Sequence, residues 1–192
     1  MFNVIVKMDA QQKAFLAHVR DAMQDYFGAD QGRIDHALQV SCYAEELLSY
    51  IDADPVTTLV AAYLHDIGIH EAERKHGSSS GKWQEIEGPP IARKILATLD
   101  AEEALTEQVA AIVAGHHTRN AVDTPEFRVI WDADALVNFA EVLPSKSAER
   151  IEGLLQGHMV TEPGFRIARR IFLKDTDSHK RCLQGHRPEI LP

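Results

Sequence analysis

Apolar residues recur at intervals of three and four along most of the chain, which is the spacing of one face of an α-helix. The segment 32–51 shows this spacing clearly, with an apolar stripe formed by Ile34, Ala37, Leu38, Ala44, Leu47, Leu48 and Ile51. A similar segment, 11–27, precedes it and ends before Gly28, a residue type that commonly terminates helices. Both segments are therefore predicted to be helices, and His36 falls beside the apolar stripe of the second.

The next helix is predicted to end in two polar residues. Asp54 and Pro55 suit the N-cap and the first position of a helix, and the apolar run that follows continues to Leu64. His65 and Asp66 come directly afterwards, where a packed helix would ordinarily place apolar side chains. An unpaired carboxylate is costly to bury. A bound metal ion would remove that cost, so this pair is a candidate metal site.

Residues 70–90 interrupt the helical pattern with charged residues, glycine and serine. We expect a long loop here, and long loops in compact domains are usually functional or disordered. Proline is tolerated in a helix only within the first turn. The helix expected over 85–99 is therefore predicted to carry Pro89 and Pro90 in its first turn.

Two later helices carry polar residues on their apolar faces. His116 continues the apolar stripe of the segment 102–117, and His117 lies beside it. In the helix that Pro125 opens, Asp134 occupies an inward position where an apolar residue is expected. Both positions therefore add candidates for a site in the core.

Further helices are predicted over 145–156 and 164–173, followed by a polar tail over 179–192. No strand is expected, and the fold class is all-α. A chain of 192 residues is long enough for one domain with a sizeable core. We therefore expect a single helical domain spanning 1–192.

The charge balance restricts the partners. Twenty Lys and Arg against 29 Asp and Glu give a net charge of -9, which argues against duplex nucleic acid or an anionic membrane as a partner. A small phosphorylated substrate remains compatible, because a bound metal can dominate the local field. Cys42 and Cys182 are too few for a disulfide framework, and no apolar run is long enough to span a membrane. We expect a soluble, cytoplasmic protein.

The order His36, then His65 and Asp66, then Asp134, on successive predicted helices, resembles the HD superfamily of metal-dependent phosphohydrolases. The sequence Leu-His-Asp-Ile-Gly ending at Gly68 matches the central motif of that superfamily. The sequence Asp-Ala-Asp-Ala-Leu-Val-Asn over residues 132–138 is similar to its closing motif, with Asp134 at the ligand position. The resemblance covers roughly residues 33–138.

This resemblance implies an HD-domain helical bundle in which His36, His65, Asp66 and Asp134 bind a divalent metal ion. Nitrogen and oxygen ligands without thiolates suit Mn, Fe, Co, Ni, Zn or Mg, and the sequence does not choose among them. Such an ion lowers the pKa of a bound water and polarises a phosphoryl oxygen. The expected function is hydrolysis of a small phosphorylated metabolite or nucleotide, with Asp66 among the catalytic residues.

Binuclear members of the superfamily, such as the HD-GYP phosphodiesterases, use a paired His-His and an extra histidine for a second metal. Here His116 and His117 match the pair, but the extra histidine is missing, and Glu85 and Glu87 stand in the comparable segment. No Gly-Tyr-Pro motif follows Asp134. This departure argues against cleavage of cyclic dinucleotides. It leaves one or two metal ions as alternatives. For a binuclear site, Glu87 is the preferred carboxylate, and a catalytic role is expected for it.

Basic residues near the expected mouth are candidates for binding the substrate's phosphate. Arg33 lies one helical turn before His36, and the others are Lys82, Arg93 and Arg119. For each, the alternative is an ordinary surface charge. Asp132 is expected either to orient a ligating histidine or to be a solvated surface acid.

Two other functions stay open from the motifs alone. The family also contains binuclear iron oxygenases that cleave carbon–carbon or carbon–phosphorus bonds with similar ligands, so the fold does not decide the reaction. The alternative from a different class is a regulatory module that senses a nucleotide without turnover. The substrate, the metal and the oligomeric state, including a homodimer, are not determined by the sequence.

Overall fold

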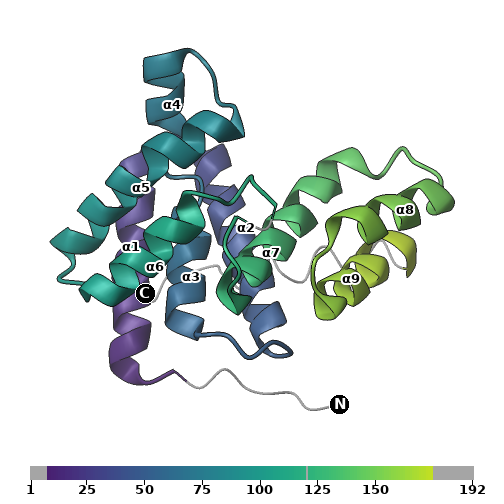
Figure 1. Ribbon diagram of the computed structural model, residues 1–192, viewed down its shortest axis with the longest axis horizontal. Coiled ribbons are helices and arrows are strands. Elements are labelled where there is room, and N and C mark those ends of the chain that lie inside the picture. The colour runs from purple at the N-terminus through teal and green to yellow at the C-terminus, as the bar shows by residue number, and fades with distance from the viewer. Residues whose placement is uncertain (1–7, 120, 175–192) are drawn as a thin grey trace, which may run out of the picture.

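The computed structural model describes residues 8–119 and 121–174, and within these residues it is helical with no strand (Figure 1). The all-α fold class predicted from the sequence is therefore confirmed. The helices are α1 (Ala10–Phe27), α2 (Gln31–Leu48), α3 (Pro55–Leu64), α4 (Ile69–His76), α5 (Gly81–Thr98), α6 (Glu103–Val113), α7 (Pro125–Val142), α8 (Ala148–His158), α9 (Glu162–Arg169) and the π-helical turn η1 (Arg170–Lys174).

Helix α3 lies at the centre of the bundle and packs against α1, α2, α6 and α7. Every residue of α3 from Thr57 to Leu64 is buried, which is why its sequence is apolar on all faces. Its start is fixed as predicted, because the Asp54 carboxylate accepts a 2.7 Å hydrogen bond from the backbone N–H of Thr57. The other end of α3 therefore delivers His65 and Asp66 into the interior.

The long loop expected over 70–90 was wrong. Helices α4 and α5 fill that segment and only Gly77–Ser80 separates them, while Pro89 and Pro90 lie in the interior of α5. Tertiary packing explains the difference. The backbone at Gly68 packs directly against α5, so closely that a methyl group at position 68 would lie 2.5 Å from the backbone nitrogen of Gly88. Such close packing overrides the local preferences of the sequence.

The helix predicted over 102–117 ends earlier than expected. Helix α6 stops at Val113, and the N–H of Gly115 bonds the carbonyl of Ile112 at 3.1 Å in a tighter turn. His116 and His117 therefore lie in the turn after α6. The predicted helices 145–156 and 164–173 correspond to α8 and to α9 with η1, and the predicted tail 179–192 lies outside the described residues.

Helices α8 and α9 lie beside one end of α7, apart from α4 and α5 (Figure 1). Asp132 of α7 joins them, because its carboxylate accepts hydrogen bonds of 2.9 Å from the backbone N–H groups of Val160 and Thr161, and one of 2.5 Å from the Thr161 hydroxyl. The carboxyl is fully buried, and burial raises its pKa to about 6 against the effect of these bonds. Asp132 is buried, so the expectation of a solvated surface acid was wrong. Among the hydrogen bonds of the described residues, none joins Asp132 to a histidine.

Among the described helices, none combines the length and the apolar character that crossing a bilayer requires.

Candidate metal centre

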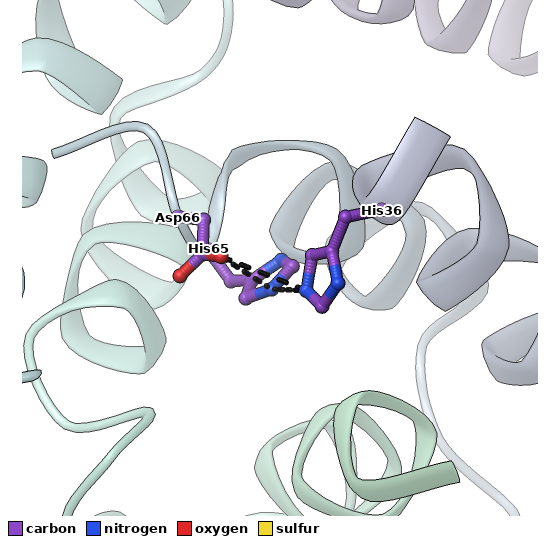
Figure 2. A group of neighbouring side chains, drawn as sticks. All are labelled: His36, His65 and Asp66. Carbon is purple, nitrogen blue, oxygen red and sulfur yellow. Dashed lines mark hydrogen bonds and ion pairs between the residues drawn. The ribbon is translucent and has the colours of Figure 1, made fainter. Parts of the chain in front are cut away.

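Three helices bring the predicted ligands together. His36 comes from α2, His65 and Asp66 from the end of α3, and Asp134 from α7. Figure 2 shows the first three side chains directed toward one another. The Nε2 atom of His36 lies 3.0 Å from Asp134 Oδ1 and 3.2 Å from His65 Nε2. The four residues that share the HD motif pattern therefore form one cluster.

The cluster is closed on one side and open on the other. The His65 side chain is fully buried, whereas those of His36, Asp66 and Asp134 are 18%, 13% and 16% exposed. His65 would hold a metal here from the buried side of the cluster. The other three ligands would leave it accessible to a substrate.

Backbone contacts fix the tautomers of the two buried histidines. The Nδ1–H of His65 donates to the Ala62 carbonyl at 2.9 Å, and the Nδ1–H of His116 donates to the Val113 carbonyl at 2.7 Å. A ring that donates through Nδ1 leaves the lone pair of Nε2 free to bind a cation. In both residues Nε2 is the atom that faces the carboxylates, so the donor set fits a divalent metal ion.

Asp66 lies between two groups of possible ligands. Its Oδ2 is 3.6 Å from His36 Nε2 and 3.7 Å from His65 Nε2. Its Oδ1 is 3.2 Å from His116 Nε2 and 3.9 Å from His117 Nε2. In each group, the ligand atoms of the two histidines and Asp66 lie within 4.8 Å of one another. One carboxylate with an oxygen in each group is suited to holding two cations side by side.

Opposite charges keep the two carboxylates ionised. Burial works to raise the pKa of Asp134, but His36 and His65, which donate to it when their rings are protonated, outweigh burial and hold that pKa well below its usual range. Burial is likewise overcome at Asp66, where the His65 charge and the His116 hydrogen bond lower the pKa. The pKa of His36 is raised, since Asp134 outweighs the effect of burial on that ring. With its histidines neutral, the centre therefore carries the negative charge of two carboxylates, and it favours binding of a cation.

The second histidine pair is positioned by Glu85 of α5. The backbone N–H of His117 and the hydroxyl of Thr118 each donate to the Glu85 carboxylate at 3.0 Å. Burial lowers the pKa of His117, which favours the neutral, metal-binding form of its ring. Glu85 thus holds the turn that presents His117, a role that the sequence pattern did not reveal.

The structure does not bring Glu87 into either group of ligands. Its two carboxylate oxygens are engaged by Lys75 Nζ at 2.6 Å and by His76 Nε2 at 2.9 Å. These partners lower the pKa of Glu87, so it is held as an ionised member of a pair between α4 and α5. The contacts favour a structural role over the expected role as a catalytic carboxylate or metal ligand.

Two of the four basic residues expected to bind phosphate adjoin the centre. Arg33 lies 3.8 Å from Glu73, and its charge is close enough to lower the pKa of His36 in part. The guanidinium of Arg119 donates to the carbonyl of Gly157 at 2.8 Å, next to His158. Both stay candidates for contact with an anionic substrate.

The other two are engaged along α5. Arg93 forms two hydrogen bonds of 2.7 Å to Glu107. Lys82 lies over the ring of Trp83, 4.8 Å from its centroid. Among the interactions of the described residues, none joins Arg93 or Lys82 to the metal-ligand side chains. The role predicted for them stays a prediction.

A cavity of about 170 Å³ opens beside the centre. Three candidate ligands line it: His116, His117 and Asp134. The other lining residues belong to α7 and to the last position of α8: Trp131, Ala135, Asn138, Phe139 and His158. The sequence pattern did not single out His158, Trp131 or Phe139. Trp131 and Phe139 lie on α7 together with Asp134. The approach of His158 depends on how the end of α8 lies against α7, which no local pattern encodes.

The model of the HD domain family matches residues 33–138, more than half of the chain. Among solved structures, a crystal structure of a predicted HD superfamily hydrolase from an uncultured Thermotogales bacterium is similar, with 24% identity, a TM-score of 0.55 and 82% of each chain covered. At this identity the likeness supports the fold alone. No curated protein matches the chain.

Proposed function

This chain belongs to the HD domain family, and from that premise we propose that it is a metal-dependent phosphohydrolase acting on a small phosphorylated metabolite or nucleotide. The superfamily consists in general of metal-dependent hydrolases. The observation that carries the proposal is the position of Asp66, which offers one oxygen to each of two histidine pairs. A partly exposed carboxylate between four imidazoles is suited to metal chemistry at the surface of a cavity.

In the proposed centre, His36, His65, Asp66 and Asp134 hold one divalent ion. His116 and His117, together with Asp66, would hold a second ion. Ions bound here would supply an activated water and polarise a phosphoryl oxygen. Mn, Fe, Co, Ni, Zn and Mg are all compatible with this donor set.

The chain's own residues have roles beyond holding metal. The Nδ2–H of Asn138 donates to Asp134 Oδ1 at 2.9 Å and fixes that carboxylate. Arg33 and Arg119 are the proposed contacts for the phosphate's negative charge, with Lys82 and Arg93 as further candidates. Glu85 acts as a positioning residue for His117.

The test is metal analysis of protein purified without chelators, together with release of inorganic phosphate from a panel of phosphate esters. We expect at least one equivalent of divalent metal and measurable phosphate release. Asp66→Ala should lose both. Asp21→Ala changes an exposed α1 aspartate that pairs with Arg20, and it should retain both. Full activity in Asp66→Ala would overturn the proposal.

The two groups of ligands around Asp66 also favour a second candidate, a binuclear iron oxygenase. It would hold about two equivalents of iron and consume O₂ with its substrate. A phosphohydrolase releases phosphate without O₂, including with a redox-inert ion. A nucleotide-sensing module would bind its ligand and leave it unchanged on long incubation.

A further inference from the structure

The cavity beside the metal centre is lined by two kinds of side chain. His116, His117 and Asp134 are candidate metal ligands. Trp131, Phe139 and His158 carry rings and are not candidate ligands. A molecule whose phosphoryl group lay at the ligands would therefore place its remaining part against these three rings.

The three rings form a preassembled wall. Trp131 and His158 are stacked, with ring centroids 5.1 Å apart and planes inclined by 21°. Phe139 and His158 meet edge to face, with ring centroids 5.1 Å apart and planes inclined by 66°. The indole N–H of Trp131 donates to the backbone carbonyl of His158 at 3.1 Å, which holds the end of α8 against α7. A planar ring can stack on or meet the edge of such a wall without first rearranging it.

The aromatic wall is suited to an uncharged group. The residues that line the cavity include no Lys or Arg. Burial lowers the pKa of His158, so its ring is neutral near pH 7. Arg119 adjoins His158 through its hydrogen bond to the Gly157 carbonyl, but it is not among the lining residues. A second phosphate against the rings would find no counter-charge in the lining itself, whereas a neutral ring would bury apolar surface.

The volume matches a group of about one ring. A dry cavity of roughly 150 Å³ binds one benzene molecule, and this cavity is about 170 Å³. A nucleoside, which has a sugar as well as a base, exceeds that volume. A cyclic dinucleotide exceeds it further.

We propose that this cavity binds the leaving group of the substrate, and that the substrate is the phosphate monoester of an alcohol or phenol with a single uncharged planar ring. Hydrolysis would break the P–O bond to the ring-bearing oxygen and add one water, which gives inorganic phosphate and the free alcohol. This inference rests on the proposed phosphohydrolase function. It narrows the substrate class and makes Trp131 and Phe139 determinants of specificity.

The test compares two non-hydrolysable probes by anaerobic isothermal titration calorimetry on the metal-loaded protein. Benzylphosphonate carries a ring on a CH₂ group that replaces the ester oxygen, and methylphosphonate carries the phosphonate without a ring. We expect benzylphosphonate to bind about tenfold more tightly, the gain typical of stacking and ring burial. In Trp131→Leu and Phe139→Leu this preference should fall to about threefold or less.

Trp83→Leu is the matched control, because Trp83 stacks on His76 away from the cavity and should leave the preference unchanged. Methylphosphonate affinity reports whether each variant keeps its phosphoryl site. If Trp131→Leu loses that affinity, the result for Phe139→Leu alone is used to judge the proposal. Equal binding of the two probes, or a preference that survives in Phe139→Leu, would overturn the ring proposal alone. Binding of neither probe to the parent protein would overturn the phosphohydrolase proposal as well.

Discussion

The Nε2 atoms of His36 and His65 lie 3.2 Å apart, although the two rings come from different helices. His65 carries its proton on Nδ1, which donates to Ala62, so its Nε2 presents a lone pair to His36 and to Asp134. Lone pairs and carboxylates gathered this closely repel one another unless a positive charge lies among them. In the absence of metal, protons supply that charge. A divalent ion would satisfy more of these donors at once.

Removal of metal is therefore expected to lower the thermal stability. A ligand at 100 times its Kd stabilises a protein by about 2.7 kcal/mol, which corresponds to roughly 5–10 °C for a chain of this size. Scanning calorimetry before and after chelation should show a decrease of this order, reversed when metal is restored. Asp66→Ala should show no such difference. A chelated parent protein as stable as the loaded one would contradict the metal centre.

The second metal position is expected to depend on Glu85 and not on Glu87. Loss of the Glu85 carboxylate leaves the N–H of His117 and the Thr118 hydroxyl without their partner, so the turn that presents His117 should loosen. Glu85→Ala should lose one of two metal equivalents and keep the other. Glu87→Ala is the control, since its contacts are with Lys75 and His76, and it should retain both equivalents. Elemental analysis distinguishes them, and the opposite result would restore Glu87 as a ligand.

The ligand cluster could be predicted because each member interrupts a local pattern. His65 and Asp66 end an apolar run, and Asp134 occupies an inward position on a helix, so spacing alone points them toward one core. Glu87 shows the limit of this reasoning. In the sequence, the position of Glu87 suits a metal ligand as well as that of Glu85 does. Only the contacts of Glu87 with Lys75 and His76 in the structure distinguish the two residues.

The features that the sequence did not predict depend on contacts between distant segments. Pro89 and Pro90 predict a helix start by local rules, but the packing of Gly68 against Gly88 holds that segment inside a continuous α5. His158 reaches the cavity because α8 folds back on α7. No spacing within α8 indicates this position.

The close approach of Gly68 to α5 predicts a cost for any side chain at that position. A methyl group there would lie 2.5 Å from the nitrogen of Gly88 and 2.7 Å from the carbonyl oxygen of Gln84, and backbone atoms cannot move aside as a flexible side chain can. Gly68→Ala should lower the free energy of unfolding by about 1–3 kcal/mol, the usual cost of overpacking. Urea denaturation followed by circular dichroism measures it.

Gly153 provides the matched control for this substitution. It lies within α8, and a methyl group there would meet nothing within 4 Å. Gly153→Ala should therefore raise the free energy of unfolding by about 0.5–1 kcal/mol through helix propensity. If both alanine variants changed stability in the same direction, the proposed close packing at Gly68 would be wrong.

Asp132 predicts a specific dependence of stability on pH. Its carboxyl has a pKa of about 6 in the folded protein, against 3.8 for an unperturbed aspartate, so the folded state binds more protons between these pH values. Its contribution to stability is fully present below about pH 4 and decreases as the pH rises through 6, by about 3 kcal/mol in total. Asp132→Asn removes this titration. It also places an amide N–H against a backbone N–H of Val160 or Thr161, which costs about 1–3 kcal/mol at every pH.

The measurement is the difference in unfolding free energy between parent and Asp132→Asn, from urea denaturation at pH 4, 6 and 8 in the presence of chelator. Groups common to both proteins cancel in this difference, and chelation removes the pH dependence of metal binding. We expect the parent's advantage over the variant to be largest at pH 4 and to shrink by about 2.4 kcal/mol by pH 8. A difference that is constant across this range would mean that the buried carboxyl stays ionised and that its hydrogen bonds to Val160 and Thr161 outweigh burial.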